Sequence, residues 1–333
     1  MGGDIVAFQM DRQLGFLATV NVAAIVAGAV LVGASFVELY NFQSMASQVP
    51  ELGFLALGVM LAMMSGNGGI DLSGIALANL SGVAAYFFLR DVISADDAPL
   101  LFTWSLIGLA LGVGLVGGML NGFLIATVGL TPIIATLGTQ LLFTGLAIVL
   151  TNGSALSIGY VEPLDDFGNA TILSVPQCFA LFLVVALAIG AILRFTPFGQ
   201  RLLLLGNNAK AARYAGIPEK RILFLTYTVC GLLASVAGIV IAARTSSVKW
   251  DYGTSYVLIA ILIAVMAGVR PEGGYGRVIC VVLSATSLQM LSSLFNFMNI
   301  SNFFRDLAWG VLLLVFIATS GFDLKAWFRA ARS

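Results

Sequence analysis

Long apolar segments dominate the chain, and short polar interruptions divide them into units of helical length. A helix that crosses a bilayer needs about 20 mostly apolar residues, and somewhat fewer where it is broken or covered by protein. Ten windows meet this requirement, at residues 16–37, 52–66, 72–89, 100–128, 132–151, 173–193, 222–244, 254–269, 276–297 and 305–321. All eight prolines lie at or near window ends, where a missing N–H costs least. The pattern predicts an all-α integral membrane protein, a polytopic bundle of about ten transmembrane helices that forms one domain over residues 1–333.

Composition narrows the function classes. With 59% hydrophobic and only 10% charged residues, the chain has too little polar surface for a water-soluble globule. It contains no histidine, which excludes most zinc chemistry and the usual serine or cysteine triads. Cys178, Cys230 and Cys280 each lie inside a window without CxxC spacing, so we expect small core residues rather than disulfide or metal partners. The windows hold no catalytic constellation, and the chain is therefore not predicted to be an enzyme.

The distribution of basic residues predicts an orientation. If the N-terminus is cytoplasmic and the windows cross in alternation, only four of the 16 Lys and Arg residues lie outside, namely Arg90, Arg244, Lys249 and Arg305. Positively charged loops favour the cytoplasm, so both termini are predicted to lie there. The opening stretch MGGDIVAFQMDRQLG leads straight into a full-length apolar window and lacks the form of a cleaved signal peptide.

A glycine-rich break, MSGNGGIDLSG at residues 64–74, separates the second and third windows. A backbone N–H or C=O group without a hydrogen-bond partner costs several kcal/mol in hydrocarbon. Such a break must therefore be buried in protein or line a water-filled cavity. Gly68 and Gly69 permit a tight turn, Asp71 is expected to be the N-cap of the next helix, and Ser73 can satisfy remaining polar groups. A rigid hairpin and a place on a solute path, the latter for Asn67, are both open interpretations.

The fifth window, PIIATLGTQLLFTG and onward, carries polar and aromatic groups at helical spacing. The candidates for lining a translocation path are Thr136, Thr139, Gln140, Phe143 and Thr144. Uncharged hydroxyl and amide groups can exchange hydrogen bonds with a neutral polyol. Leu130 and Thr131, in the short turn before this window, are candidates for a cytoplasmic gate. The alternative is that the threonines bond to carbonyls of their own helix, and both remain open.

The longest cytoplasmic connection, residues 194–221, is basic and predicts a short helix at the membrane surface between the sixth and seventh windows. Asn207 and Asn208 can cap a helix of AKAARYA, Gly216 is a natural stop, and Pro218 prevents continuation. Lys210 and Arg213 are three residues apart and share a face. These charges contact another protein or serve only to fix the topology, and the residues alone leave both possible.

Four ordered motifs resemble the permeases of ABC importers of the ribose, xylose, arabinose and galactoside type. TPFGQRLLLLGNNAKAARYAGIP (196–218) is similar to the cytoplasmic signature of that family. GGIDLS (68–73), TPIIATLGTQLLFTGLA (131–147), and GLLASVAGIVIAAR (231–244) with its follow-on GGYG (273–276) match in the same order. The resemblance therefore covers about residues 50–320.

The resemblance implies a permease subunit in a bacterial inner membrane that forms the path for a monosaccharide or sugar-like solute. It also implies three protein partners besides membrane lipid: a second permease copy or paralogue, a cytoplasmic double-cassette ATPase and a periplasmic substrate-binding protein; no nucleic acid is involved. No GxxxxGK[ST] loop occurs, so ATP and magnesium are expected on the ATPase and no cofactor on this chain. The family's coupling element corresponds to Asn208, Lys210, Ala211, Arg213, Tyr214 and Gly216.

Arg90, Arg244 and Lys249 oppose the predicted orientation. Facing outward, they are expected to pair with acidic residues of the binding protein and to steer its docking. The alternative function is an ion-coupled secondary transporter, which would carry ionisable groups at mid-membrane positions. Asp71 is the candidate for such a group, although it lies at a predicted helix start.

Overall fold

The computed structural model describes residues 2–321, without the side chains of residues 2–12, 302 and 319–321. The predicted cytoplasmic C-terminal tail lies outside the described residues. Helices dominate, and they are α1 (Gly2–Leu31), α2 (Ala34–Val37), α3 (Leu39–Met64), α4 (Gly74–Leu89), α5 (Pro99–Phe123), the π-helical turn η1 (Leu124–Val128), α6 (Pro132–Thr151), α7 (Glu162–Asn169), α8 (Gln177–Phe195), α9 (Pro197–Asn207), α10 (Ala209–Tyr214), α11 (Glu219–Thr245), α12 (Tyr256–Met266), α13 (Val278–Phe297) and α14 (Asn302–Gly321).

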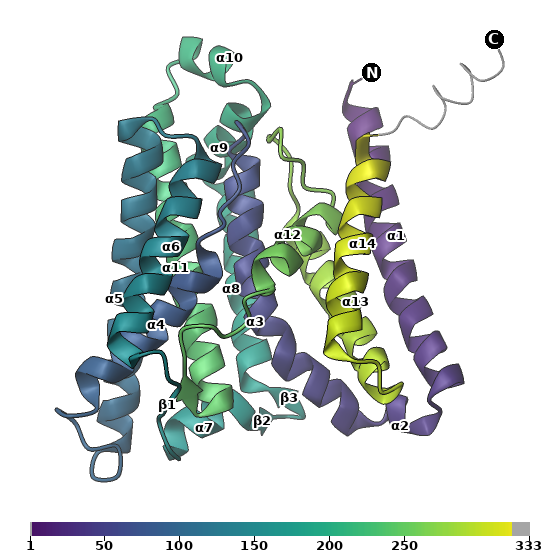
Figure 1. Ribbon diagram of the computed structural model, residues 1–333. Helices are drawn as coiled ribbons and strands as arrows, with labels where there is room; N and C mark the ends of the chain where they lie inside the picture. Colours follow the sequence, from purple (N-terminus) through teal and green to yellow (C-terminus); the bar gives the residue numbers. More distant parts are fainter. Residues whose placement is uncertain (1, 322–333) are drawn as a thin grey trace.

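Four two-residue strands occur among the described residues, in two antiparallel pairs. The strand β1 (Leu156–Ser157) pairs with β4 (Ser247–Val248), and β2 (Thr171–Ile172) pairs with β3 (Val175–Pro176). These strands and α7 lie at one end of the bundle, and α10 lies at the other end (Figure 1). The strands thus join connections between long helices and form no layer of their own.

The long helices run side by side between these two ends (Figure 1). Within the described part of the chain, seven helices are long and apolar enough to cross a membrane, and α4 and α12 are shorter apolar helices. The helix α1 begins, and α14 ends, at the same end of the bundle as α10 (Figure 1). The architecture is that of a multi-pass integral membrane protein.

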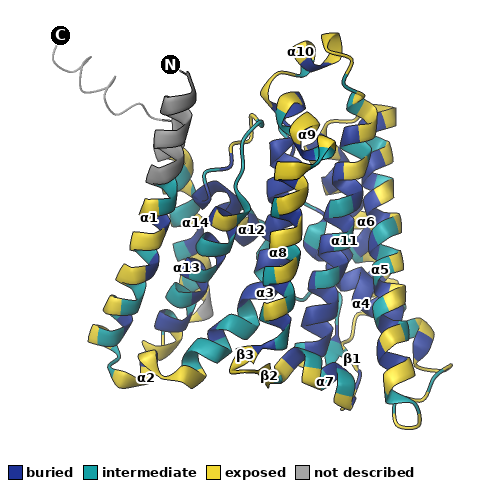
Figure 2. Cartoon of the chain, turned by 180° about the vertical axis from the view of Figure 1, so that it is seen from behind, coloured by how far each residue is buried: buried dark blue, intermediate teal, exposed yellow. Residues whose placement is uncertain are grey.

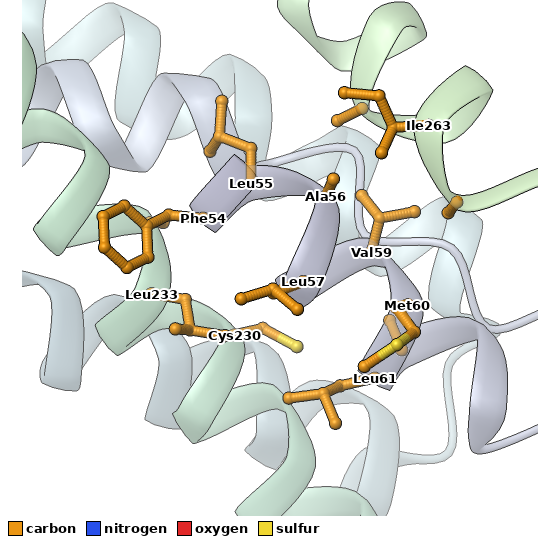
Figure 3. Packing of buried hydrophobic residues seen from close by; sticks show 14 of the residues in the cluster. Phe54, Leu55, Ala56, Leu57, Val59, Met60, Leu61, Cys230, Leu233 and Ile263 are labelled. Carbon is orange, nitrogen blue, oxygen red and sulfur yellow. The ribbon is translucent and has the colours of Figure 1, made fainter. Parts of the chain in front are cut away.

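The core lies around α3 and α11, which are mostly buried, while exposed residues follow the outer sides of α5 and α8 (Figure 2). Phe54 of α3 meets the edge of Phe182 of α8 with ring centroids 5.3 Å apart. One turn further along α3, the Cys230 thiol donates to the Gly58 carbonyl at 3.2 Å, and Figure 3 shows Cys230 beside α3. All three cysteines are free and buried, as expected of small core residues.

Small residues let α5 and α11 approach closely. A Cβ added to Gly118 would lie 2.7 Å from the Tyr227 carbonyl oxygen, so only glycine fits there. Gly114 and Gly231 face each other across the same contact. Because lipid provides no hydrophobic drive between helices, such close packing is what holds them together. Gly114, Gly118 and Gly122, spaced four residues apart on α5, thus serve packing within the chain.

The start of α3 differs from the second predicted window, 52–66. The helix begins at Leu39, so the expectation that every proline lies near a helix end is wrong for Pro50, which lies inside α3. Residues 39–51 carry several amides, hydroxyls and the acid Glu51, which hide this helical half from a search for apolar runs. Neighbouring helices and polar side chains can satisfy the backbone around such a proline.

Candidate functional site

The chain leaves helical geometry between α3 and α4, at residues 65–73. Gly66, Asn67 and Gly68 have φ values of 78°, 56° and 66°, which glycine and asparagine adopt most readily. Gly69, the second glycine expected to permit the turn, is buried and donates its N–H to the Gly66 carbonyl at 2.9 Å. Asn67 is exposed. The break is thus a compact turn with one polar side chain facing outward.

Asp71 is not the N-cap of α4. The N-cap is Ser73, whose carbonyl accepts from Leu77 at 2.9 Å, and its side chain makes no capping bond. The buried Asp71 carboxylate instead accepts from the Ser73 N–H at 2.9 Å and the Ser73 hydroxyl at 2.7 Å. Aspartate commonly bonds its own backbone two residues onward, and this turn closes before the helix begins.

A chain of buried hydrogen bonds joins the break to α5 and α6. The Asn121 amide of α5 donates to the Ser73 hydroxyl at 2.8 Å. The Thr139 hydroxyl of α6 donates to the Asn121 carbonyl oxygen at 2.6 Å. Two helices and the break therefore share one network that ends at the Asp71 carboxylate.

Thr136 forms a second link between α6 and the break. Its hydroxyl accepts from the Leu72 N–H at 3.2 Å and lies 3.1 Å from the Ile70 carbonyl and 2.8 Å from the Pro132 carbonyl of its own helix. The other members of the predicted path set differ in exposure, with Phe143 buried and Gln140 and Thr144 half-buried. Thr136 and Thr139 thus bond both within and across helices.

Three glycine-containing segments meet in backbone contact at the break. Gly274 donates its N–H to the Met64 carbonyl at 3.1 Å. A Cβ on Gly66 would lie 2.9 Å from the Cα of Gly206, and one on Gly206 would lie 2.5 Å from the Gly274 nitrogen. We call Gly66, Gly206, Gly273 and Gly274 the glycine junction. It places the end of α9, immediately before α10, directly against the broken segment.

The predicted coupling residues gather on and around α10. The Asn208 side chain caps the helix by accepting from the Ala211 N–H at 3.0 Å, and Gly216 follows it with φ of 74°. Tyr214 is 94% exposed. Arg213 pairs with Glu219 at 2.5 Å, and this hydrogen bond raises the pKa of Arg213 above its ordinary value. Lys210 and Ala211 are exposed as well. The surface is charged, aromatic and open.

The predicted gate residues lie in the turn between η1 and α6. Leu130 donates its N–H to the Leu124 carbonyl at 3.1 Å, and Thr131 is the extended residue before α6. Both side chains are exposed. They are not in the hydrogen-bonded network of the break.

A polar cavity of about 340 Å³ lies between α3, α12, α13 and α14, and the sequence analysis did not anticipate it. Glu51 is almost fully buried there and pairs with Arg244 of α11. The other Glu51 oxygen accepts from the Tyr252 hydroxyl at 3.1 Å and the Tyr256 hydroxyl at 3.2 Å. Burial is the main cause, and the Glu51 charge the next, that raises the pKa of Tyr252 to about 12. The Tyr252 hydroxyl therefore stays a neutral donor.

Further polar side chains surround this cavity. They include Gln48, Ser255, Gln289, Ser292, Arg305, Asp306 and Trp309. The sequence contained two signals for them. Gln48 and Glu51 are three residues apart and share a helix face, and Gln289 is a polar residue inside an apolar window.

Each predicted docking residue has an ionic partner within the chain. Arg90 pairs with Asp91 at 3.3 Å, and Lys249 pairs with Asp251 at 3.5 Å. Arg244 differs because it pairs with the buried Glu51 rather than facing outward. Arg244 and Lys249 flank β4, whose partner β1 lies at the end opposite α10 (Figure 1).

Comparisons with known proteins place these features in a family. The family described as "Branched-chain amino acid transport system / permease component" matches residues 41–319. The ribose import permease protein RbsC of Escherichia coli K12 is 32% identical, covering 84% of this chain and 85% of that protein. The autoinducer 2 import system permease protein LsrD of Photorhabdus temperata is 29% identical, covering 84% and 86%. RbsC of Bacillus subtilis is 31% identical, covering 84% of each.

No solved structure matches this chain significantly. The family match nevertheless spans nearly all the helices, from α3 to α14, and includes the break, the glycine junction and α10. The chain therefore belongs to the family of branched-chain amino acid transport system permease components.

Proposed function

We propose that this chain is the permease subunit of an ABC importer and forms the path for a monosaccharide or a similar small polar solute. The observation that carries this proposal is the direct backbone contact between the end of α9 and the broken segment. An exposed short helix, α10, is thereby attached to the break between α3 and α4. Relatives named as ribose and autoinducer 2 import permeases support the same function.

An ATPase would supply the energy by binding α10. Asn208, Lys210, Ala211, Arg213, Tyr214 and Gly216 form the proposed contact. Exposed aromatic and arginine side chains are favoured at protein interfaces, which supports this assignment. ATP and magnesium would then bind the ATPase, and this chain would hold no cofactor.

The proposed topology has ten crossings and both termini in the cytoplasm, with the whole chain as one permease domain. The crossings are α1, α3, α4, α5, α6, α8, α11, α12, α13 and α14. A periplasmic binding protein would then dock at the end opposite α10, using Arg90 and Lys249, while Arg244 would act indirectly by fixing the end of α11. A second permease subunit and the lipid of the inner membrane would complete the assembly.

Within the path, we propose solute contact by the partly exposed residues Asn67, Gln140 and Thr144. Thr136, Thr139 and Phe143 would hold α6 against the break and so shape the same wall. Gly68, Gly69, Asp71 and Ser73 would keep the break in its turn, and Leu130 and Thr131 would form the cytoplasmic gate. Uncharged groups with scattered hydrogen bonds suit a solute that must leave again.

Reconstitution in nanodiscs with the candidate ATPase and binding protein tests the function. ATP hydrolysis stimulated only when all three components and one class of solute are present is the expected result. Uptake by the same complex in proteoliposomes should require ATP. If the chain alone carried solute in response to a proton or sodium gradient, the proposal would be wrong and ion-coupled transport would replace it.

A further inference from the structure

We propose that the cavity between α3, α12, α13 and α14 is a binding site for the transported solute, and that this solute is a neutral polyhydroxylated molecule. The inference rests on the proposed function and adds to it a binding site apart from the proposed path residues of α6, none of which lines this cavity. It is carried by three observations: the buried acid Glu51 is already paired with Arg244, the side-chain oxygen of Gln289 accepts no bond from the described residues, and Trp309 lines the same cavity.

Glu51 and the half-buried Arg244 neutralise each other inside the cavity, although the Nε–H of Arg244 has no hydrogen-bond partner among the described residues. Both oxygens of Glu51 are used, one by Arg244 and the other by the hydroxyls of Tyr252 and Tyr256. A buried carboxylate that is paired and fully hydrogen-bonded is not available to a ligand without breaking those bonds. Glu51 and its three partners therefore form a fixed part of the cavity lining. They offer no unpaired charge to an ammonium or carboxylate group of a ligand.

The remaining charges lie at the margin. Arg305 is half-buried and donates to the Ser292 hydroxyl at 3.3 Å and to the Asn296 carbonyl oxygen at 3.0 Å. Its neighbour Asp306 is exposed and carries the opposite sign. The interior thus favours a solute without net charge, because a charged one would be desolvated there without a counter-ion.

The polar atom left available to a ligand is the side-chain oxygen of Gln289. This side chain is buried, with 6% of the residue exposed, and its N–H donates to the Gln48 carbonyl oxygen at 3.1 Å. Gln48 in turn donates to the Ser44 carbonyl at 3.0 Å. Among the described residues nothing donates to the Gln289 carbonyl oxygen. A side-chain oxygen that belongs to a residue lining a polar cavity and that accepts no bond from the protein is a position for a ligand hydroxyl.

The aromatic wall and the cavity size fit a small sugar. Trp309 lines the cavity and is held against Phe295 with ring centroids 5.9 Å apart. A flat apolar ring can pack on the C–H face of a sugar while the amide binds its hydroxyls. The volume of 340 Å³ is at the lower end of the ~300–1,000 Å³ of small-molecule sites. A branched-chain amino acid, by contrast, would bring two charges into a cavity whose one buried acid, among the described residues, is already paired with Arg244.

Ligand protection of an introduced cysteine tests the site directly. The native cysteines are first removed by Cys178→Ala, Cys230→Ala and Cys280→Ala, and Gln289→Cys is added to this background. In nanodiscs, D-ribose or D-galactose at saturation should slow maleimide labelling of this cysteine by about threefold or more, and L-leucine should not. Gln177→Cys, at the start of α8 outside the cavity, is the matched control and should label at the same rate with and without sugar.

Uptake by the full complex separates this inference from the proposed function. Gln289→Ala should lower sugar uptake about fivefold to tenfold, the loss expected for one hydrogen bond, while Gln177→Ala should leave it unchanged. If wild-type complex imports sugar but neither sugar protects Gln289→Cys, or if leucine alone protects it, the inference is overturned. If wild-type complex shows no ATP-dependent import, the proposed function fails, and protection by sugar still demonstrates the binding site.

Discussion

Two regions of this bundle are built differently. Near α10, the contacts that join the break to α9 are backbone against backbone, through the glycine junction. Around the middle of α3, the polar cavity is lined by side chains, among them Glu51 and Gln289. Backbone packing without side chains leaves little room for independent motion, so it can transmit a displacement. Side chains that line a cavity and are not fully hydrogen-bonded, such as Gln289, can bind a solute. The difference suits force transmission in one region and recognition in the other.

The largest effect on stability is expected from Glu51→Ala. This change leaves the half-buried Arg244 guanidinium without its counter-ion and removes the acceptor of two tyrosine hydroxyls. Breaking a buried ion pair by removing one partner costs about 3–5 kcal/mol. A marked fall in the melting temperature of the purified protein, measured by intrinsic fluorescence, is the expected outcome.

The double variant Glu51→Leu with Arg244→Met is the matched control. Replacing both charges with apolar groups of similar volume is often neutral, so most of the lost stability should return. A single Glu51→Ala variant that melts like the wild type would show that the pair does not hold α3 to α11.

A smaller loss is expected from Gly206→Ala at the glycine junction. The new Cβ meets backbone atoms of Met64 and Gly274, which cannot rotate away, and overpacking of this kind costs about 1–3 kcal/mol. Because α9 must then move off the break, uptake per ATP hydrolysed should fall while α10 itself stays intact. Both rates are measured in proteoliposomes with the ATPase and binding protein.

Gly138→Ala serves as the control for that experiment. No heavy atom lies within 4 Å of a Cβ at this position on α6, so alanine should be tolerated and should slightly favour the helix. An equal loss of coupling in both glycine variants would argue against transmission through the junction.

A loss of similar size is expected in the buried network around Asn121. Thr139→Val keeps the shape of the side chain but leaves the Asn121 carbonyl oxygen without its donor, at a cost of about 1–3 kcal/mol. Thr144→Val, on the same helix but half-buried, should cost less. Equal melting temperatures for the two variants would contradict the importance of the network.

Local features were predictable from the sequence, and features assembled from distant residues were not. The window 132–151 coincides with α6 because it is apolar throughout and begins at a proline, and Asn208 caps α10 through a bond only three residues long. The first half of α3 was missed because hydropathy cannot detect a polar helix that other helices cover. The cavity combines residues from five helices and a loop, so no local pattern reveals it.

The same reasoning explains the error at Asp71. An acid just before an apolar run fits the N-cap pattern, yet the Ser73 side chain is drawn to Asn121 of α5 and the Asp71 carboxylate to Ser73. Contacts between helices therefore moved the helix start by two residues. Gly206 likewise looks like an ordinary helix-end glycine until Gly66 and Gly274 are placed against it.

The smallest effect on stability, with a large effect on coupling, is expected from Arg213→Glu. The side chain is exposed and makes one surface ion pair with Glu219, and such pairs contribute little to folding, so the melting temperature should not change. The variant places two acids side by side on the proposed ATPase surface, which should repel the partner's complementary groups and uncouple hydrolysis from uptake. Lys220→Glu, an exposed charge reversal just beyond Glu219, is the control and should retain more coupling. Normal solute-stimulated hydrolysis in Arg213→Glu would show that α10 does not couple the ATPase to the path. The contrast between the region near α10 and the polar cavity would then rest on the glycine junction alone.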